Sequence, residues 1–222
     1  MSIIEVIESK NFVILDTETT GLYDDDEIVS IAIIDSDGQT LLNQLVKPVR
    51  PIPADATRIH GITNEMVSAA HCLPIEQINA LLAGREIIVY NASYDMAMLY
   101  RSVRALQAPT IQWRSVANWY CAMEHFAEIY GEWNDYRGNY KWQRLSTACA
   151  YYNIPVVGAH GALADCLMTL AVCQKMAEAV HETAPASLSE FALIGCAECG
   201  ATGQPLIGGL CPQCLVKLSG DE

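Results

Sequence analysis

The sequence contains no run of eighteen apolar residues, so it offers no candidate for a transmembrane helix. Its first residues, Met1 to Glu5, lack the basic flank and the long apolar core of a secretory signal peptide. We therefore expect a cytoplasmic protein with no membrane partner. The nine cysteines are an odd number at scattered spacings, which argues against a disulfide framework and predicts mostly reduced thiols.

Basic residues are also scarce, with 13 Lys and Arg against 26 Asp and Glu and a formal net charge of −13. Proteins that grip long duplex nucleic acid usually present a basic face. If the substrate is nucleic acid, we expect it to be held over a few nucleotides, by metal ions and stacking more than by cationic surface. The 222 residues, 51% of them hydrophobic, suffice for one large domain or for a domain with a small appendage.

The apolar run Phe12 to Leu15 predicts a buried strand, and Asp16 and Glu18 follow it. Residues two apart on a strand point to the same face, so these two carboxylates should lie together. Like charges at that spacing repel unless a cation lies between them, which makes the pair a candidate Mg²⁺ or Mn²⁺ site. Taken alone, the pair is weak evidence, because such a pair more often marks a solvated strand end.

A second, almost wholly apolar strand is predicted over 27–35, and the hairpin signal Asp37-Gly38 leads into a third, antiparallel strand over 39–47. The acidic run 24–26 is interpreted as a solvated turn. Three prolines make 48–53 irregular. After that segment we expect a short helix starting near Glu65, with Thr63 or Asn64 as its cap, and then a helix over 74–82.

A fourth strand is predicted over 86–90, followed by a helix from about Ser93 whose apolar residues recur at helical spacing. Asp95 therefore lies in the first turn of a helix directly after a strand, where the helix dipole also favours a carboxylate for structural reasons alone. Helices that alternate with strands after a hairpin indicate a mixed α/β sheet.

Further along, we expect a fifth strand over 110–119, helices over 121–130 and 144–152, and a loop over 132–142. The loop is rich in aromatic residues: Trp133, Tyr136, Tyr140 and Trp142. Such side chains can stack on bases, but they serve equally well as a lid over the core or as a dimer contact.

His160 lies on a glycine-flanked loop, and the sequence turns strongly helical from Ala162 through Ala179. Asp165 is thereby anchored early in a long helix, five residues after the histidine. This arrangement suits a metal ligand that holds its position and a general base that reaches the substrate.

Together these motifs resemble the DEDDh 3′→5′ exonucleases, the RNase T-like or epsilon-type family. Within that family they look similar to exonuclease X and to related phage- or plasmid-borne exonucleases. The resemblance covers about residues 10 to 180. It rests on Asp16-x-Glu18, His60-Gly61-Ile62-Thr63, Asn91-x-x-x-Asp95 and His160-x-x-x-x-Asp165.

The resemblance implies a ribonuclease H-like fold, with a mixed five-stranded sheet flanked by helices, and metal-dependent hydrolysis of phosphodiester bonds at 3′ ends. Two Mg²⁺ or Mn²⁺ ions, about 3.5–4 Å apart, would flank the scissile phosphate. By resemblance, Asp16 would bridge both ions, Glu18 and Asp165 would complete the shell of one, and Asp95 would act near the other. His160 would take the proton from the attacking water.

By resemblance too, Thr19 and Thr20 would hold the 3′-terminal nucleotide and His60 would line the same cleft. The resemblance also suggests a homodimer. We expect single-stranded DNA or DNA 3′ ends as the substrate. The motifs do not separate DNA from RNA, so a 3′→5′ exoribonuclease is the alternative.

A second unit is predicted after the nuclease domain of residues 1–184, as a linker and a zinc ribbon over 185–222. Two Cys-x-x-Cys pairs with eleven residues between them indicate one structural Zn²⁺ with four thiolate ligands: Cys196, Cys199, Cys211 and Cys214. With Lys217 as its only basic residue, the ribbon fits a protein contact better than a grip on DNA. A third hypothesis therefore treats the chain as a zinc-ribbon accessory protein of a replisome.

Overall fold

A computed structural model describes residues 1–183, and the four cysteines of the predicted zinc site lie outside that range. The chain divides into two compact units, Met1–Ala177 and Glu178–Glu222, and the fold described below is that of the first. No helix within residues 1–183 is long and apolar enough to cross a bilayer.

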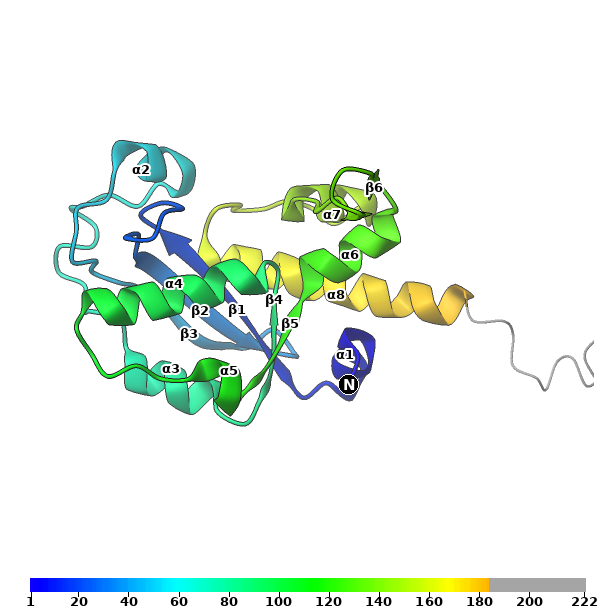
Figure 1. Ribbon diagram of the computed structural model, residues 1–222, viewed down its shortest axis with the longest axis horizontal. Helices are drawn as coiled ribbons and strands as arrows, with labels where there is room; N and C mark the ends of the chain where they lie inside the picture. The colour runs from blue at the N-terminus through cyan, green and yellow to red at the C-terminus, as the bar shows by residue number, and fades with distance from the viewer. Residues whose placement is uncertain (184–222) are drawn as a thin grey trace, which may run out of the picture. The chain divides into compact units, whose positions relative to one another are not determined.

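The centre of the fold is a five-stranded mixed sheet in the order β3-β2-β1-β4-β5 (Figure 1). Its strands are β1 (Phe12–Thr19), β2 (Ile28–Asp35), β3 (Thr40–Leu45), β4 (Glu86–Val89) and β5 (Asn118–Cys121). The first three form an antiparallel meander, and β4 and β5 run parallel to β1. The sheet confirms the predicted mixed α/β class and the predicted hairpin between β2 and β3.

Helices cover both faces of this sheet. They are α1 (Ile3–Ser9), α2 (Ala54–His60), α3 (Ile75–Leu82), α4 (Ala92–Ala105), α5 (Trp113–Val116), α6 (Ala122–Tyr130), α7 (Leu145–Tyr151) and α8 (Ala162–Thr183). Residues of α1, α6, α7 and α8 pack on one face, and residues of α3, α4 and α5 pack on the other.

Successive side chains of β1 point alternately to the two helical layers. Ile14 faces the α8 layer, whereas Val13 and Leu15 face the α4 layer, and all three are completely buried. Because β1 is the central strand, both of its faces are covered, which explains its unbroken apolar run. The two acidic side chains lie within the last four residues of β1 rather than after its end.

The prediction of a helix starting near Glu65 was wrong. The helix of this segment is α2, Ala54–His60, and residues 64–69 form turns. Pro53 occupies the N-cap position of α2, where its fixed φ and missing N–H are tolerated. Asn64 caps no helix, because its side chain hydrogen-bonds to both backbone groups of Ile52.

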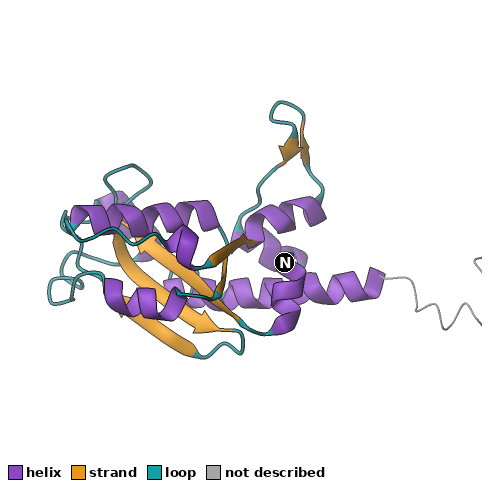
Figure 2. Ribbon diagram, turned by 60° about the horizontal axis from the view of Figure 1, so that its bottom comes forward, coloured by secondary structure: helices purple, strands orange, loops and turns teal. Residues whose placement is uncertain are grey.

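Two further boundaries differ from the predictions. The segment 110–119 contains the short helix α5, and strand β5 begins only at Asn118. The predicted loop 132–142 contains a small antiparallel hairpin, β6 (Trp133–Asn134) with β7 (Asn139–Tyr140), which projects from the helical layer (Figure 2). The Trp133 and Tyr140 rings meet edge to face across the hairpin, with centroids 5.1 Å apart, and this cross-strand pair favours strand over loop.

Candidate active site

Three of the predicted acidic residues come together at the end of β1. Asp16 and Glu18 lie on β1, Asp165 lies in the first turn of α8, and one carboxylate oxygen from each lies within 4.8 Å of the other two. The residues are about 150 positions apart in the chain, so only the packing of α8 on this face of the sheet unites them. Among residues 1–183 this is the one cluster of acidic, His or Cys side chains with metal-ligand spacing.

Asp95 lies beside this cluster rather than within it. Its side chain is 4% exposed, and Thr17 Oγ1 donates a hydrogen bond of 2.7 Å to its Oδ1. Thr17 alternates with Asp16 and Glu18 along β1, so it points to the α4 side of the sheet. Asp95 therefore approaches the cluster from the opposite layer, and its charge still raises the pKa of Asp16.

Burial raises the pKa of every carboxyl group in the cluster and of Asp95, and repulsion by neighbouring carboxylates adds to the rise at Asp16, Glu18 and Asp95. Burial raises the pKa of Asp16 well above its ordinary value, and the charges of Asp95, Asp165 and Glu18 add to the rise. Burial, then Asp165 and Asp95, raise the pKa of Glu18 to about 8. Burial raises the pKa of Asp95 to about 7, although the Thr17 hydrogen bond opposes it. Without a cation, this cluster holds protons at neutral pH.

The donor set fits a hard divalent cation. All the converging ligand atoms are carboxylate oxygens, which Mg²⁺ and Mn²⁺ prefer. Asp165 Oδ1 is moreover buried without a hydrogen-bond partner, a costly state for a carboxylate oxygen that a bound cation would relieve.

Two histidines border the cluster. His160 has a left-handed backbone (φ 65°) just before Gly161, and its charge counteracts the rise in the pKa of Asp165 that burial causes. His60 ends α2, and its Nε2 lies 3.2 Å from the Thr19 carbonyl oxygen while its Nδ1 accepts from the Ile62 N–H. Burial lowers the pKa of His60, the Thr19 carbonyl opposes this, and the charge of His160 adds to the decrease. Because Nδ1 accepts a hydrogen bond, the ring is neutral and donates to Thr19 through Nε2.

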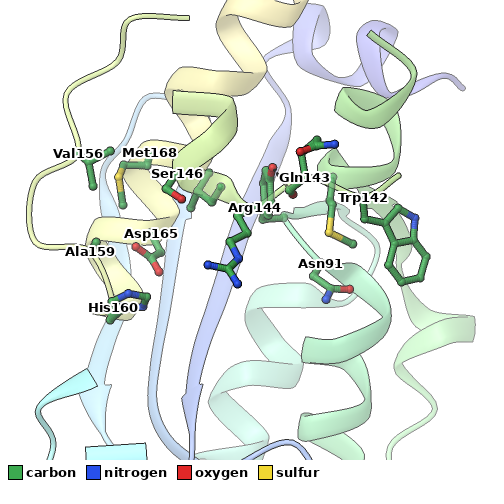
Figure 3. Close-up of a pocket in the computed structure, with 13 residues that line it drawn as sticks. Asn91, Trp142, Gln143, Arg144, Ser146, Val156, Ala159, His160, Asp165 and Met168 are labelled. Carbon is green, nitrogen blue, oxygen red and sulfur yellow. Dashed lines mark hydrogen bonds between the residues drawn. The ribbon is translucent and has the colours of Figure 1, made fainter. Parts of the chain in front are cut away.

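Two cavities contain side chains of the cluster. The first, here called the threonine cavity, has about 540 Å³ and is lined by Glu18, Thr19, Thr20, His60 and Tyr94, among others. The second, here called the arginine cavity, has about 430 Å³ and is lined by Asn91, Trp142, Arg144, His160 and Asp165, among others (Figure 3). Glu18 lines the first and Asp165 the second, so the cluster stands between them.

The predicted substrate residues Thr19 and Thr20 both line the threonine cavity, but their polar groups are largely occupied. Thr19 Oγ1 lies 2.6 Å from Tyr94 Oη, and Thr20 Oγ1 donates to Asp26. The Thr20 N–H donates to the Glu27 carbonyl. These two residues therefore shape the wall of the cavity more than they offer free donors to a ligand.

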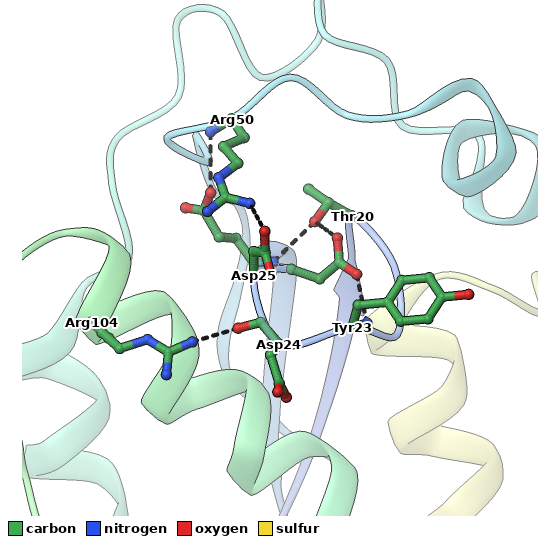
Figure 4. A network of polar contacts seen from close by, with 8 residues as sticks. Thr20, Tyr23, Asp24, Asp25, Arg50 and Arg104 are labelled. Atoms are coloured by element: carbon green, nitrogen blue, oxygen red, sulfur yellow. Dashed lines mark hydrogen bonds and ion pairs between the residues drawn. The ribbon is translucent and has the colours of Figure 1, made fainter.

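The acidic run 24–26 is an exposed turn, as predicted, and arginines also contact it (Figure 4). Asp24 pairs with Arg101, its carbonyl accepts from Arg104, and Asp25 pairs with Arg50. Asp26 accepts from the Tyr23 N–H and from Thr20, which fixes the turn under the threonine cavity. A Cβ at Gly21 would lie 2.5 Å from the Asp26 carboxylate, so a larger residue there would displace that carboxylate from its hydrogen bonds.

Sequence reasoning missed several residues of this site. Leu22, Tyr23 and Ile59 give the threonine cavity exposed apolar walls, and Arg144 enters the other cavity. Two of these apolar residues, Leu22 and Tyr23, follow the first acidic motif in a turn, where polar residues are usual. That position could have indicated the apolar wall of a binding cavity. Arg144 gave no signal, because nothing in the order of residues places it near Asp165.

The comparisons with known proteins agree with this geometry. Residues 13–173 match the RNase T family, described as exonuclease. Exonuclease CP81 of Escherichia phage 186 is 43% identical over 173 residues, which cover 75% of this chain and 88% of the phage protein.

Solved structures with the same fold include two nucleases with ligands. Exonuclease X in complex with 5′ overhanging duplex DNA is 26% identical, with a TM-score of 0.54, and the match covers 78% of this chain and 92% of that one. The nuclease domain of 3′hExo, a DEDDh family member bound to rAMP, is 14% identical, with a TM-score of 0.57 and coverage of 77% and 92%. These similarities confirm the expected ribonuclease H-like fold.

Proposed function

This chain belongs to the RNase T-type exonuclease family, and we propose that it removes nucleotides one at a time from the 3′ ends of DNA, using two divalent cations and a histidine base. The observation that carries the proposal is the convergence of Asp16, Glu18 and Asp165 within 4.8 Å, with Asp95 and His160 close by.

The acidic residues would hold Mg²⁺ or Mn²⁺. Asp16, at the centre of the cluster, would bridge two ions, Glu18 and Asp165 would complete the shell of one, and the more deeply buried Asp95 would act near the other. When bound, such ions lower the pKa of the attacking water and neutralise charge on the leaving 3′ oxygen.

His160 would act as the general base. It lines the arginine cavity next to Asp165, so its ring is within reach of a water molecule near the carboxylates. An imidazole titrates near neutrality and can therefore be unprotonated and accept the proton of that water.

The threonine cavity would take the 3′-terminal nucleotide. Its polar edge contains Thr19, Thr20 and His60, and its apolar wall contains the exposed side chains of Leu22 and Ile59, a combination that suits a sugar and a base. A cavity of about 540 Å³ holds one nucleotide, which favours removal of single residues from an end.

DNA is the favoured substrate because exonuclease X, the most similar of the ligand-bound structures above in sequence, was solved with duplex DNA. RNA is the alternative, supported by the rAMP bound to 3′hExo. The test is digestion of matched 5′-labelled DNA and RNA oligonucleotides with Mg²⁺ or Mn²⁺. We expect a ladder that shortens from the 3′ end with DNA, and none with Asp16→Ala.

A ladder with RNA alone would move the substrate to RNA. The absence of cleavage of either oligonucleotide by the full chain, with both metals, would contradict the proposal and favour the accessory-protein hypothesis.

Several predictions concern features outside residues 1–183 or beyond one chain. We infer a zinc ribbon with four thiolate ligands: Cys196, Cys199, Cys211 and Cys214. We propose that this ribbon contacts another protein. We also propose that the protein is a homodimer in the cytoplasm. Metal analysis of the full chain should find one zinc per chain. Replacement of Cys196 and Cys199 by serine should remove that zinc, and a zinc-free wild type would refute the ribbon.

A further inference from the structure

Arg144 extends into the cavity beside the acidic cluster. The residue directly precedes α7, its side chain is exposed, and its guanidinium points into the arginine cavity between the Asp165–His160 wall and Asn91 (Figure 3). It is the one Lys or Arg that lines either of the two cavities that the cluster borders.

The guanidinium of Arg144 has no partner within residues 1–183, either as an ion pair or as a side-chain hydrogen bond. Three other arginines are paired: Arg50 and Arg101 with the acidic run 24–26, and Arg58 with Asp55. Arg85 and Arg137 also have no side-chain partner within residues 1–183, but they line neither cavity. In a chain with twice as many acids as bases, an unpaired cation in the same cavity as Asp165 is a feature that needs a ligand to explain it.

That ligand must carry negative charge and reach the cluster. Arginine offers a planar fork of donors that matches the oxygens of a phosphate, and its charge does not depend on pH. The proposed reaction brings a chain of phosphodiesters into this cleft, so a substrate phosphate is the anion available there.

The order of the nucleotide-binding subsites along the cleft determines which substrate phosphate Arg144 would contact. With the terminal nucleotide in the threonine cavity and the scissile phosphate at the carboxylates, the next nucleotide enters the arginine cavity. We propose that Arg144 binds the phosphate on the 5′ side of this penultimate nucleotide, one phosphate beyond the bond that is cut. Trp142, half-exposed in the same wall, lies where the base of that nucleotide would pack. The inference rests on the proposed exonuclease function and defines its second subsite.

The test compares two dinucleotides that differ only in the phosphate concerned, dithymidylate with and without a 5′-phosphate. For the wild type we expect kcat/KM about tenfold higher with the 5′-phosphate, the gain typical of one charge-assisted hydrogen-bonded contact. Arg144→Ala should bring the ratio of the two substrates close to one, mainly through KM. Arg144→Lys should keep part of the preference.

Arg137→Ala is the matched control, because Arg137 is an exposed arginine of the nearby hairpin and lines neither cavity. It should leave the ratio at the wild-type value. A wild type without preference for the 5′-phosphate, or an Arg144→Ala variant that keeps the preference, would overturn the inference.

A third substrate, the p-nitrophenyl ester of thymidine 5′-monophosphate, has only the scissile phosphate. It distinguishes failure of the Arg144 inference from failure of the proposed exonuclease function. A wild type that cleaves this ester and dithymidylate supports the proposed function whatever Arg144 does. A wild type that cleaves none of the three substrates contradicts the function, and the inference falls with it.

Discussion

Thr17 on β1 and Asp95 on α4 are joined by a buried hydrogen bond, in which Thr17 Oγ1 donates to Asp95 Oδ1 over 2.7 Å. The bond links the strand that carries the first two acidic residues to the helix that carries the third. It also stabilises the charged form of Asp95, because the carboxylate accepts it and its pKa is held lower than burial alone would set it.

Thr17→Val should therefore weaken metal-dependent activity without touching a proposed ligand. The pKa of Asp95, about 7 with the hydrogen bond, should rise when the donor is removed. We expect the acid limb of the kcat–pH profile to move to higher pH and the Mg²⁺ concentration for half-maximal activity to increase. Thr17→Ser keeps the hydroxyl and should resemble the wild type. If Thr17→Val and Thr17→Ser had the same pH profile and the same Mg²⁺ requirement, the hydrogen bond would not influence Asp95 in this way.

The stability of the protein without divalent metal should depend on pH. Glu18 has a folded-state pKa of about 8 against an ordinary value of 4.5, and the pKa of Asp16 is also raised. The folded state therefore binds more protons than the unfolded state between about pH 4.5 and pH 8, so the free energy of unfolding falls as pH rises through that window.

Thermal denaturation in buffer without Mg²⁺ or Mn²⁺ should show this decrease, and added Mg²⁺ should raise Tm more at pH 8 than at pH 6. Asp16→Asn removes one repelling charge and should raise the metal-free Tm at pH 8 by about 5 °C. A Tm that stays flat from pH 5 to pH 8 would show that the carboxyl groups do not repel one another as described.

His160→Ala should lower kcat by at least about 100-fold, the usual contribution of a positioned general base. Mn²⁺ binding should change little, because the carboxylates remain. His71→Ala, at an exposed histidine outside both cavities, is the control and should keep full activity. Equal losses of turnover and of Mn²⁺ affinity in His160→Ala would point to a ligand rather than a base.

Trp142→Ala should weaken the binding of single-stranded oligonucleotides by about tenfold, the effect of losing one stack on a base. Trp142 is 53% exposed and lines the arginine cavity. Tyr136, at the tip of the hairpin and 96% exposed, lines neither cavity, so Tyr136→Ala should bind like the wild type. Fluorescence anisotropy with a labelled oligonucleotide, in buffer without Mg²⁺ or Mn²⁺, measures the affinity of both variants. A larger loss of affinity for Tyr136→Ala than for Trp142→Ala would place the nucleic-acid strand on the hairpin instead.

The elements that could be predicted from the sequence are those in which buried apolar residues form a continuous run or recur at a regular period. Strands β1, β2 and β4 and helices α4 and α8 lie close to their expected positions because a continuous apolar run or a helical period marks each of them. Short elements were less well marked. Helix α1 was not predicted, although Ser2 and Glu5 form a capping box at its start.

Part of the site could be predicted because its acidic residues lie on these clearly marked strands and helices. The motifs located Asp16, Glu18, Asp95 and Asp165 on the correct elements, but no local pattern could say that Asp95 would approach from the opposite layer. The place of Arg144 depends on how α7 and α8 pack together on the sheet, which is long-range information. The occupied hydroxyls of Thr19 and Thr20 likewise depend on Tyr94 and Asp26, whose contacts follow from the fold.

Titration of the full chain with Mn²⁺ at pH 8, followed by electron paramagnetic resonance of the free ion, tests the metal site most directly. The wild type should bind Mn²⁺, and Asp16→Asn and Asp165→Asn should each lose at least about tenfold in affinity, as expected when one of few carboxylate ligands is removed. Asp37→Asn, at an exposed turn, should bind like the wild type. Mn²⁺ affinity that is the same in all four proteins would contradict the account, because the converging carboxylates would then not hold the cation.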